Sequence, residues 1–188
     1  TTYIFISTIP CITIFRKYFS KNIIINHFKG ENDQFLCEII RKDLLDDFIK
    51  KVVNLNSTIK FSIYEINSFL IKNQTLKKNK VTLIEYAAFF GSIQIINYLK
   101  SKGVKITPSL LTYSIHSHNT ELVKLLENDS NITFSEGSEK VDKNTYKNCF
   151  YESIKCHWNE YGNYLLSKYQ PEEPDEVLNQ IIKNYNFL

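Results

Sequence analysis

The sequence predicts an all-α fold, a solenoid of short helix pairs that is closed by a capping helix at the C-terminus. The 188 residues are enough for one domain with a substantial core, and 43% of them are hydrophobic. Only 5 glycines and 4 prolines occur, which disfavours a β fold with many tight turns. A fixed offset at independent positions is typical of a repeat protein. Here the offset is 27 residues, and it aligns Ala87 with Ser114, Gly91 with His118 and Ile96 with Val123.

Residues 81–104 contain the clearest repeat. Ala87 and Ala88 are adjacent small apolar residues, which allow a neighbouring helix to approach closely. Gly91 lies where the first helix should end, because glycine adopts turn conformations at no steric cost. A second helix is expected after this turn, since apolar residues recur there at helical spacing, at Ile95, Ile96 and Leu99.

The same segment resembles an ankyrin repeat, whose signature T-P-L-H-x-A-A-x-x-G is followed by an I-V-x-x-L-L helix and a closing glycine. Leu83 departs from this pattern because proline is usual there, and Glu85 departs because histidine is usual there. The loss of that histidine is expected to weaken a hydrogen bond at the start of the helix. The residues in the signature positions are Thr82, Leu83, Ile84, Glu85, Ala87, Ala88, Gly91, Ile95, Ile96, Tyr98, Leu99 and Gly103.

More closely, the chain is similar to a divergent ankyrin family of the DUF3447 type, which is expanded in parasitic protists. The resemblance covers about residues 35–169 and rests on the phrases TLIEYAAFFGSIQIINYL, TPSLLTYSIHSHNTELVKLLE and ESIKCHWNEYGNYL. It implies an ankyrin-type solenoid in which the first helix of each repeat lines a concave groove. It implies no particular activity.

Three further repeats are expected, at about residues 34–53, 107–128 and 145–169. The last repeat is offset from its predecessor by 39 residues instead of 27, because a polar loop at 128–143 adds length. The alignment gives the turn position of Gly91 to His118 and His157. In the first repeat Asp43 is expected at the turn, where its short polar side chain can cap the next helix.

Three other segments lie outside these repeats. In the 54–80 insertion, Ser62 and Glu65 have the spacing of a capping box and predict a helix at about 62–72. Residues 171–188 begin with an acidic cluster and continue with an apolar face of Val177, Leu178, Ile181, Ile182 and Tyr185, which predicts the capping helix. Residues 1–33 lie outside the family resemblance. They can be read as a tail, as a truncated membrane anchor or as a wrongly assigned gene start.

The candidates for metal binding or nucleophilic chemistry are His116, His118, Cys156 and His157. His118 and His157 are already explained by their turn position. Cys156 and His157 are adjacent, and adjacent side chains on a helix point about 100° apart, so they cannot easily share one ion or one proton. The four cysteines include no C-x-x-C pair, and a reducing compartment is expected. We therefore expect no catalytic residue, no cofactor and no metal site.

An interaction surface is expected instead. By the ankyrin resemblance, the groove should be lined by the first-helix residues Tyr86, Phe89, Phe90, Tyr113, His116, Ser117, Glu152 and Lys155. Exposed aromatic residues are typical anchors for a protein partner. The alternative left open is that the 54–80 insertion covers these residues, so that they belong to the core.

The sequence thus favours a cytoplasmic, non-catalytic protein–protein interaction module with no small-molecule substrate. A membrane contact is expected, if at all, only through residues 1–33. A second hypothesis is binding of a polyanion such as RNA, although the net charge is only +3. It requires one continuous face formed by Lys72, Lys77, Lys78, Lys80, Lys102 and Lys105. A third is an enzyme or metal protein that uses the Cys and His residues.

Overall fold

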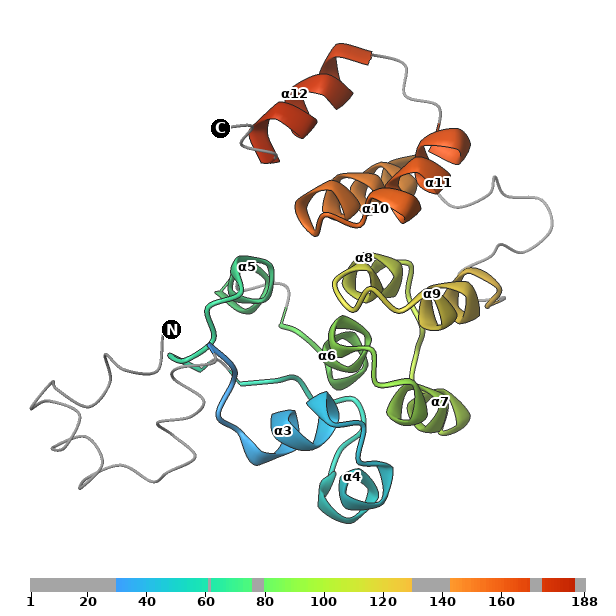
Figure 1. The fold of residues 1–188 in the computed structure, drawn as a ribbon. Coiled ribbons are helices and arrows are strands. Elements are labelled where there is room, and N and C mark those ends of the chain that lie inside the picture. Colours follow the sequence, from blue (N-terminus) through green and yellow to red (C-terminus); the bar gives the residue numbers. More distant parts are fainter. Residues whose placement is uncertain (1–29, 61, 76–79, 130–142, 170–173, 185–188) are drawn as a thin grey trace, which may run out of the picture. The chain divides into compact units, whose positions relative to one another are not determined.

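The computed structural model describes residues 30–60, 62–75, 80–129, 143–169 and 174–184 (Figure 1). The regular elements in these ranges are all α-helices, which confirms the all-α expectation. None of the helices in these ranges is both long and apolar enough to cross a bilayer. The helices are α3 (Phe35–Arg41), α4 (Leu45–Lys51), α5 (Ser68–Thr75), α6 (Leu83–Phe90), α7 (Ile93–Ser101), α8 (Ser109–Ile115), α9 (Thr120–Glu127), α10 (Lys143–Lys155), α11 (Asn159–Tyr169) and α12 (Pro174–Asn184).

The described residues divide into two compact units. The smaller unit comprises residues 30–38 and 58–81, and the larger comprises 39–57 and 82–184, apart from the undescribed gaps. Helix α3 contributes residues to both units. All eight residues of the expected groove belong to the larger unit. Most of the expected N-terminal tail, and residues 130–142 of the expected loop, lie outside the described residues.

In the smaller unit, the helix of the insertion begins at Ser68 and not at residue 62 as predicted. Asn67 caps this helix, because its side-chain oxygen accepts hydrogen bonds from the N–H groups two and three residues further on, at 3.0 and 3.2 Å. The predicted start is therefore wrong. Ile63 and Ile66 precede the helix, and their side chains are 78% and 72% exposed.

In the larger unit, the same turn recurs after the first helix of each pair. The four residues expected at these turns all have positive φ angles, 51° for Asp43, 76° for Gly91, 52° for His118 and 56° for His157. Few residues other than glycine adopt this left-handed conformation without cost. The helix pairs α3–α4, α6–α7, α8–α9 and α10–α11 are thus joined by equivalent turns.

Backbone hydrogen bonds close these turns in a common way. The N–H of Gly91 donates to the carbonyl of Ala88 at 3.2 Å, and the N–H of Ser92 donates to the carbonyl of Ala87 at 2.9 Å. This is the Schellman arrangement, which satisfies carbonyl groups at the end of a helix. The equivalent bonds are present after α3 and after α10.

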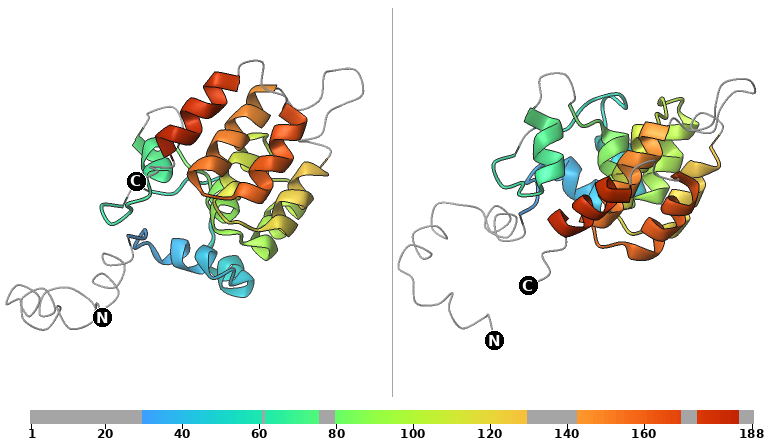
Figure 2. Two further views of the ribbon diagram at one scale, coloured as in Figure 1. Left: turned by 45° about the horizontal axis from the view of Figure 1, so that its top comes forward. Right: turned by 90° about the horizontal axis from the view of Figure 1, so that it is seen from above.

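The first helices of the last three pairs pack in a row, α6 against α8 and α8 against α10 (Figure 1). Each of these helices also packs against the second helix of its own pair, as two further directions of view show for α10 and α11 (Figure 2). Ala87 and Ala88 of α6 are fully buried. Their small side chains leave room for the close packing of neighbouring helices.

The start of α6 corrects the expectation drawn from Glu85. This residue forms a capping box, because its carboxylate accepts a hydrogen bond from the N–H of Thr82 at 2.9 Å while the Thr82 hydroxyl accepts one from the N–H of Glu85 at 3.3 Å. The expected weakening at this helix start is therefore wrong. Thr82 and Glu85 together satisfy N–H groups at this helix start.

The C-terminal helix α12 packs against α10, but only part of the apolar face of α12 is buried. Val177 is buried, whereas Leu178 and Ile182, four residues apart on one face, are each 55% exposed. The expectation that all these apolar residues face the stack is therefore wrong. Tyr185 lies outside the described residues.

Candidate functional site

The expected open aromatic patch is not open. Tyr86 is 0% exposed, Tyr113 is 6% exposed and Phe89 is 8% exposed. Glu152, also expected in the groove, is 8% exposed. The prediction that these four side chains present themselves to a partner is therefore wrong.

Contacts within the larger unit explain much of this burial. The Tyr86 hydroxyl accepts a hydrogen bond from Nη1 of Arg41 at 2.9 Å. The Phe89 ring stacks on the His116 ring with centroids 4.6 Å apart, and it also contacts Phe90 at 4.9 Å. Phe89 and His116 occupy equivalent positions of successive repeats, 27 residues apart. Aromatic side chains at these positions bury one another instead of lining an open groove.

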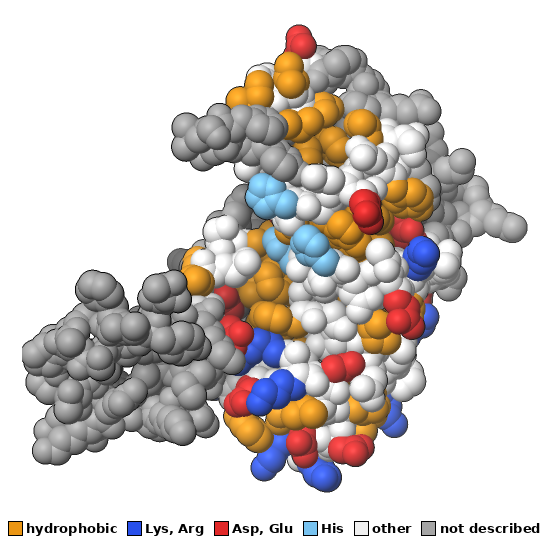
Figure 3. Space-filling view, viewed as in Figure 1, with side chains coloured by type: hydrophobic (Ala, Val, Ile, Leu, Met, Phe, Trp, Pro, Cys, Tyr) orange, Lys and Arg blue, Asp and Glu red, His pale blue; other side chains and the backbone are white. Residues whose placement is uncertain are grey.

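The other four expected groove residues keep some contact with the surface. Phe90, His116 and Ser117 are half-buried, and Lys155 is exposed. The positions of Phe90 and Ser117 are equivalent, and so are those of His116 and Lys155. Figure 3 shows histidine side chains beside hydrophobic ones on one face of the molecule. We call Phe90, His116, Ser117 and Lys155 the turn-end row, because each lies near the turn that follows a first helix.

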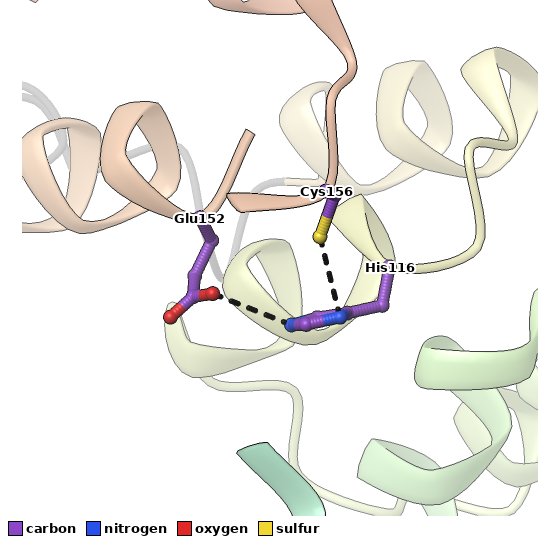
Figure 4. A group of neighbouring side chains, drawn as sticks. All are labelled: His116, Glu152 and Cys156. Atoms are coloured by element: carbon purple, nitrogen blue, oxygen red, sulfur yellow. Dashed lines mark hydrogen bonds and ion pairs between the residues drawn. The ribbon is translucent and has the colours of Figure 1, made fainter. Parts of the chain in front are cut away.

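Three of the polar residues form a cluster that spans two repeats. His116 follows α8, Glu152 lies in the last turns of α10, and Cys156 directly follows α10. Figure 4 shows the imidazole of His116 between the other two side chains, with one ring nitrogen toward each. Its Nδ1 lies 3.3 Å from Sγ of Cys156, and its Nε2 lies 3.6 Å from a carboxylate oxygen of Glu152. The first is a hydrogen-bond distance for sulfur, whereas the second is too long for a hydrogen bond and makes an ion pair only when the imidazole is protonated.

The Glu152 carboxylate is held in its charged form. Burial raises its pKa, but contacts from His116 and Lys155 outweigh this effect, and the pKa lies below the ordinary value of 4.5. Nζ of Lys155 lies 2.7 Å from the second oxygen of the same carboxylate. The cluster therefore contains a buried anion that two neighbouring groups stabilise.

The Cys156 thiol is held in its protonated form. Burial and the negative charge of Glu152 raise its pKa to about 12, and the opposing effect of Lys155 is smaller. The thiol also sits at the C-terminal end of α10, where the helix dipole disfavours a negative charge. A thiolate forms here only if a neighbouring group accepts the proton.

One ligand atom from each of the three side chains lies within 4.8 Å of the other two, so this group could hold a metal ion. In the arrangement seen here, however, the thiol and the carboxylate approach opposite nitrogens of one imidazole, and an ion would bind only one of these nitrogens. The geometry is that of a chain from thiol to imidazole to carboxylate. Such a chain can transfer a proton away from sulfur and stabilise the charge that results.

Sequence reasoning placed His116 and Glu152 in one expected groove, but it did not bring Cys156 to them. The repeat alignment contains the missing signal, because Glu152 and Cys156 are offset by 39 residues from Tyr113 and Ser117, which lie close to His116 at the end of α8. His118 and His157 take the turn positions, as expected, and do not join the cluster of ligand-type side chains. The His118 ring instead stacks on Trp158, with centroids 5.2 Å apart.

The basic face required for polyanion binding is described only in part. Lys80, Lys102 and Lys105 are exposed. The side chain of Lys72, together with Lys77 and Lys78, lies outside the described residues. Lys80 belongs to the smaller unit and the other two exposed lysines belong to the larger one.

No protein-family model, no curated protein and no solved structure matches this chain.

Proposed function

We propose that this chain is a divergent ankyrin-type solenoid, of the DUF3447 kind, that binds a protein partner and catalyses no reaction. The observation that supports this function is the recurrence of one left-handed turn in four helix pairs, three of whose first helices pack in a row. Stacked repeats build an extended surface from equivalent positions of successive units. A surface of this kind suits recognition of another protein.

The proposed contact surface is the turn-end row. Phe90 offers a half-buried aromatic ring, and the guanidinium of Arg41 lies 5.9 Å from the centre of that ring. Lys155 offers a charge at the other end of the row, with 47% of its side chain exposed. The buried residues Tyr86, Phe89 and Tyr113 would support this row from beneath without touching the partner.

We further propose a reducing compartment, such as the cytoplasm. Cys149 and Cys156, both in the described part of the chain, are free thiols. Free thiols persist where glutathione and thioredoxin keep them reduced.

A photo-crosslinking amino acid at position 155 of the full chain tests the proposed surface in the source cell. A control crosslinker belongs at position 124, an exposed residue of the second helix α9. We expect a protein to be captured from position 155 and not from position 124. Capture of RNA in its place would favour the polyanion hypothesis.

The captured protein is then purified and its affinity measured against two variants. Phe90→Ala is expected to weaken binding by about 2 kcal/mol or more, because partly buried aromatic residues dominate interface energies. Lys124→Ala should leave the affinity unchanged. Since Phe90 contacts the Tyr86 ring at 4.8 Å, the fold of Phe90→Ala must be checked by circular dichroism. Equal affinity of a folded Phe90→Ala variant would rule out the turn-end row as the contact surface.

A further inference from the structure

Cys156 differs from the other described cysteines in both exposure and surroundings. Cys37 and Cys149 are buried, at 0% and 1% exposure, whereas Cys156 is half-buried. The Cys149 thiol contacts a threonine hydroxyl, that of Thr112 at 3.7 Å. The Cys156 thiol contacts an imidazole, which can accept a proton.

The contacts of His116 suit a base that receives this proton. For the thiol to donate to Nδ1 at 3.3 Å, the ring must carry its own hydrogen on Nε2. That nitrogen faces the Glu152 carboxylate at 3.6 Å, so the proton and the anion attract each other. Stacking of the ring on Phe89 restrains its orientation. A nucleophile, a base and a group that orients the base are therefore aligned, although the distance from Nε2 of His116 to the Glu152 carboxylate is longer than a hydrogen bond.

We propose that Cys156 is a site of covalent modification by small disulfides, with His116 as the general base and Glu152 as the positioning residue. The sulfur of Cys156 attacks one sulfur of the disulfide while its proton passes to Nδ1 of His116. A new S–S bond forms to Cys156, the old S–S bond breaks, and the departing thiolate takes the proton from His116. One half of the small disulfide stays bound to Cys156, which is thereby oxidised, and the other half leaves as a thiol, which is the reduced product. This inference is independent of the proposed partner binding.

The charges around the thiol make one substitution decisive. The groups that face Cys156 are Glu152 and Lys155 of α10 and His116, which directly follows α8. As a mere negative charge, Glu152 opposes thiolate formation, so Glu152→Gln would speed up the reaction. As the group that orients the imidazole and stabilises its positive charge, Glu152 assists the reaction, so Glu152→Gln would slow it down. The two roles therefore predict opposite changes in the reaction rate of Glu152→Gln.

The experiment measures the reaction of the full chain with dipyridyl disulfide, a neutral probe whose approach the local charges do not bias. Peptide mass spectrometry assigns the adduct to its cysteine. We expect Cys156 to react first, His116→Asn to slow its reaction by about a hundredfold and Glu152→Gln to slow it at least about tenfold. The rate should level off with rising pH well below the thiol pKa of about 12, because the base and not free thiolate controls it.

Two controls separate these effects from unfolding. Rates in denaturant should be equal for all variants, and each native rate is divided by this value. Cys149→Ser should leave the fast reaction intact, while Cys156→Ser should abolish it. The proposal is overturned if Glu152→Gln reacts faster than the unmodified chain, or if the rate for His116→Asn is unchanged.

Discussion

The Asp43 carboxylate accepts a hydrogen bond from the backbone N–H of Ile95 at 3.0 Å, so the turn of one helix pair caps the second helix of the next pair. Its other oxygen accepts from the N–H of Gln94, also at 3.0 Å. Ser92 adds a second link, because its hydroxyl donates to the carbonyl of Ile40 at 2.5 Å. These two helix pairs are thus joined by polar contacts as well as by apolar packing.

Asp43 both caps a helix and adopts a positive φ angle, and substitutions at this position should separate these two roles. Asp43→Asn should keep the stability, because asparagine both caps helices and tolerates a positive φ. Asp43→Gly removes the cap alone, and Asp43→Ala removes the cap and adds backbone strain, so the latter should cost more, about 1–2 kcal/mol. Urea unfolding measures the free energies. Equal stability of the alanine and asparagine variants would contradict the capping role.

The packing of Ala88 predicts a penalty for a larger side chain. This residue is fully buried in α6, so Ala88→Leu should overpack the stack and cost about 1–3 kcal/mol. Asn97→Leu in α7 is the control, because its side chain is exposed. Thermal melts of both variants provide the comparison. An unchanged midpoint for Ala88→Leu would show that the repeat register is wrong.

Gly162 of α11 should resist a substitution that normally stabilises a helix. Replacing a glycine inside a helix by alanine usually gains about 1 kcal/mol. At Gly162, however, an added Cβ would lie 3.0 Å from Oγ of Ser153, a fully buried residue whose hydroxyl also donates to the carbonyl of Phe150. We therefore expect Gly162→Ala to lower the free energy of unfolding.

A double-mutant cycle tests the cause of that loss. Ser153→Ala removes the obstructing oxygen, so Gly162→Ala should be less destabilising, or even stabilising, in that background. If the effect of Gly162→Ala is the same in both backgrounds, contact with Ser153 does not explain why glycine is needed.

The charge on Glu152 predicts a loss of stability in acid. The pKa of this carboxyl is lower in the folded chain than its ordinary value of 4.5, so the folded state favours the charged form. The resulting stability is fully present above the unfolded pKa and is lost as the pH falls through the folded pKa. Urea unfolding between about pH 7 and about pH 3 should therefore show a weaker pH dependence for Glu152→Gln than for the unmodified chain.

Lys155→Gln provides an intermediate case. It removes one of the two groups that lower the pKa of Glu152 but leaves His116 in place. Its pH dependence should lie between those of the other two chains. Identical curves for all three would mean that the ion pair seen at 2.7 Å does not stabilise the fold.

The sequence by itself determined the helix pairs and the positions of their turns. Both depend on local chemistry, since a helix of this size is marked by the spacing of its apolar residues and by the residue that ends it. The offsets of 27 and 39 residues therefore align Gly91, His118 and His157 from the order of residues alone. Local chemistry also gave one wrong helix start, because Ser62 has the features of a helix cap while Asn67 performs that role.

Only the tertiary structure decided which side chains are buried and which polar groups meet. Periodicity assigns Tyr86, Phe89 and Tyr113 to one kind of helix position, but their burial depends on what packs against that position from other repeats. His116 and Cys156 are 40 residues apart, and the stacking of α8 on α10 brings their side chains within 3.3 Å. A contact of this kind depends on the depth and orientation of two packed helices, which the order of residues along either helix does not specify.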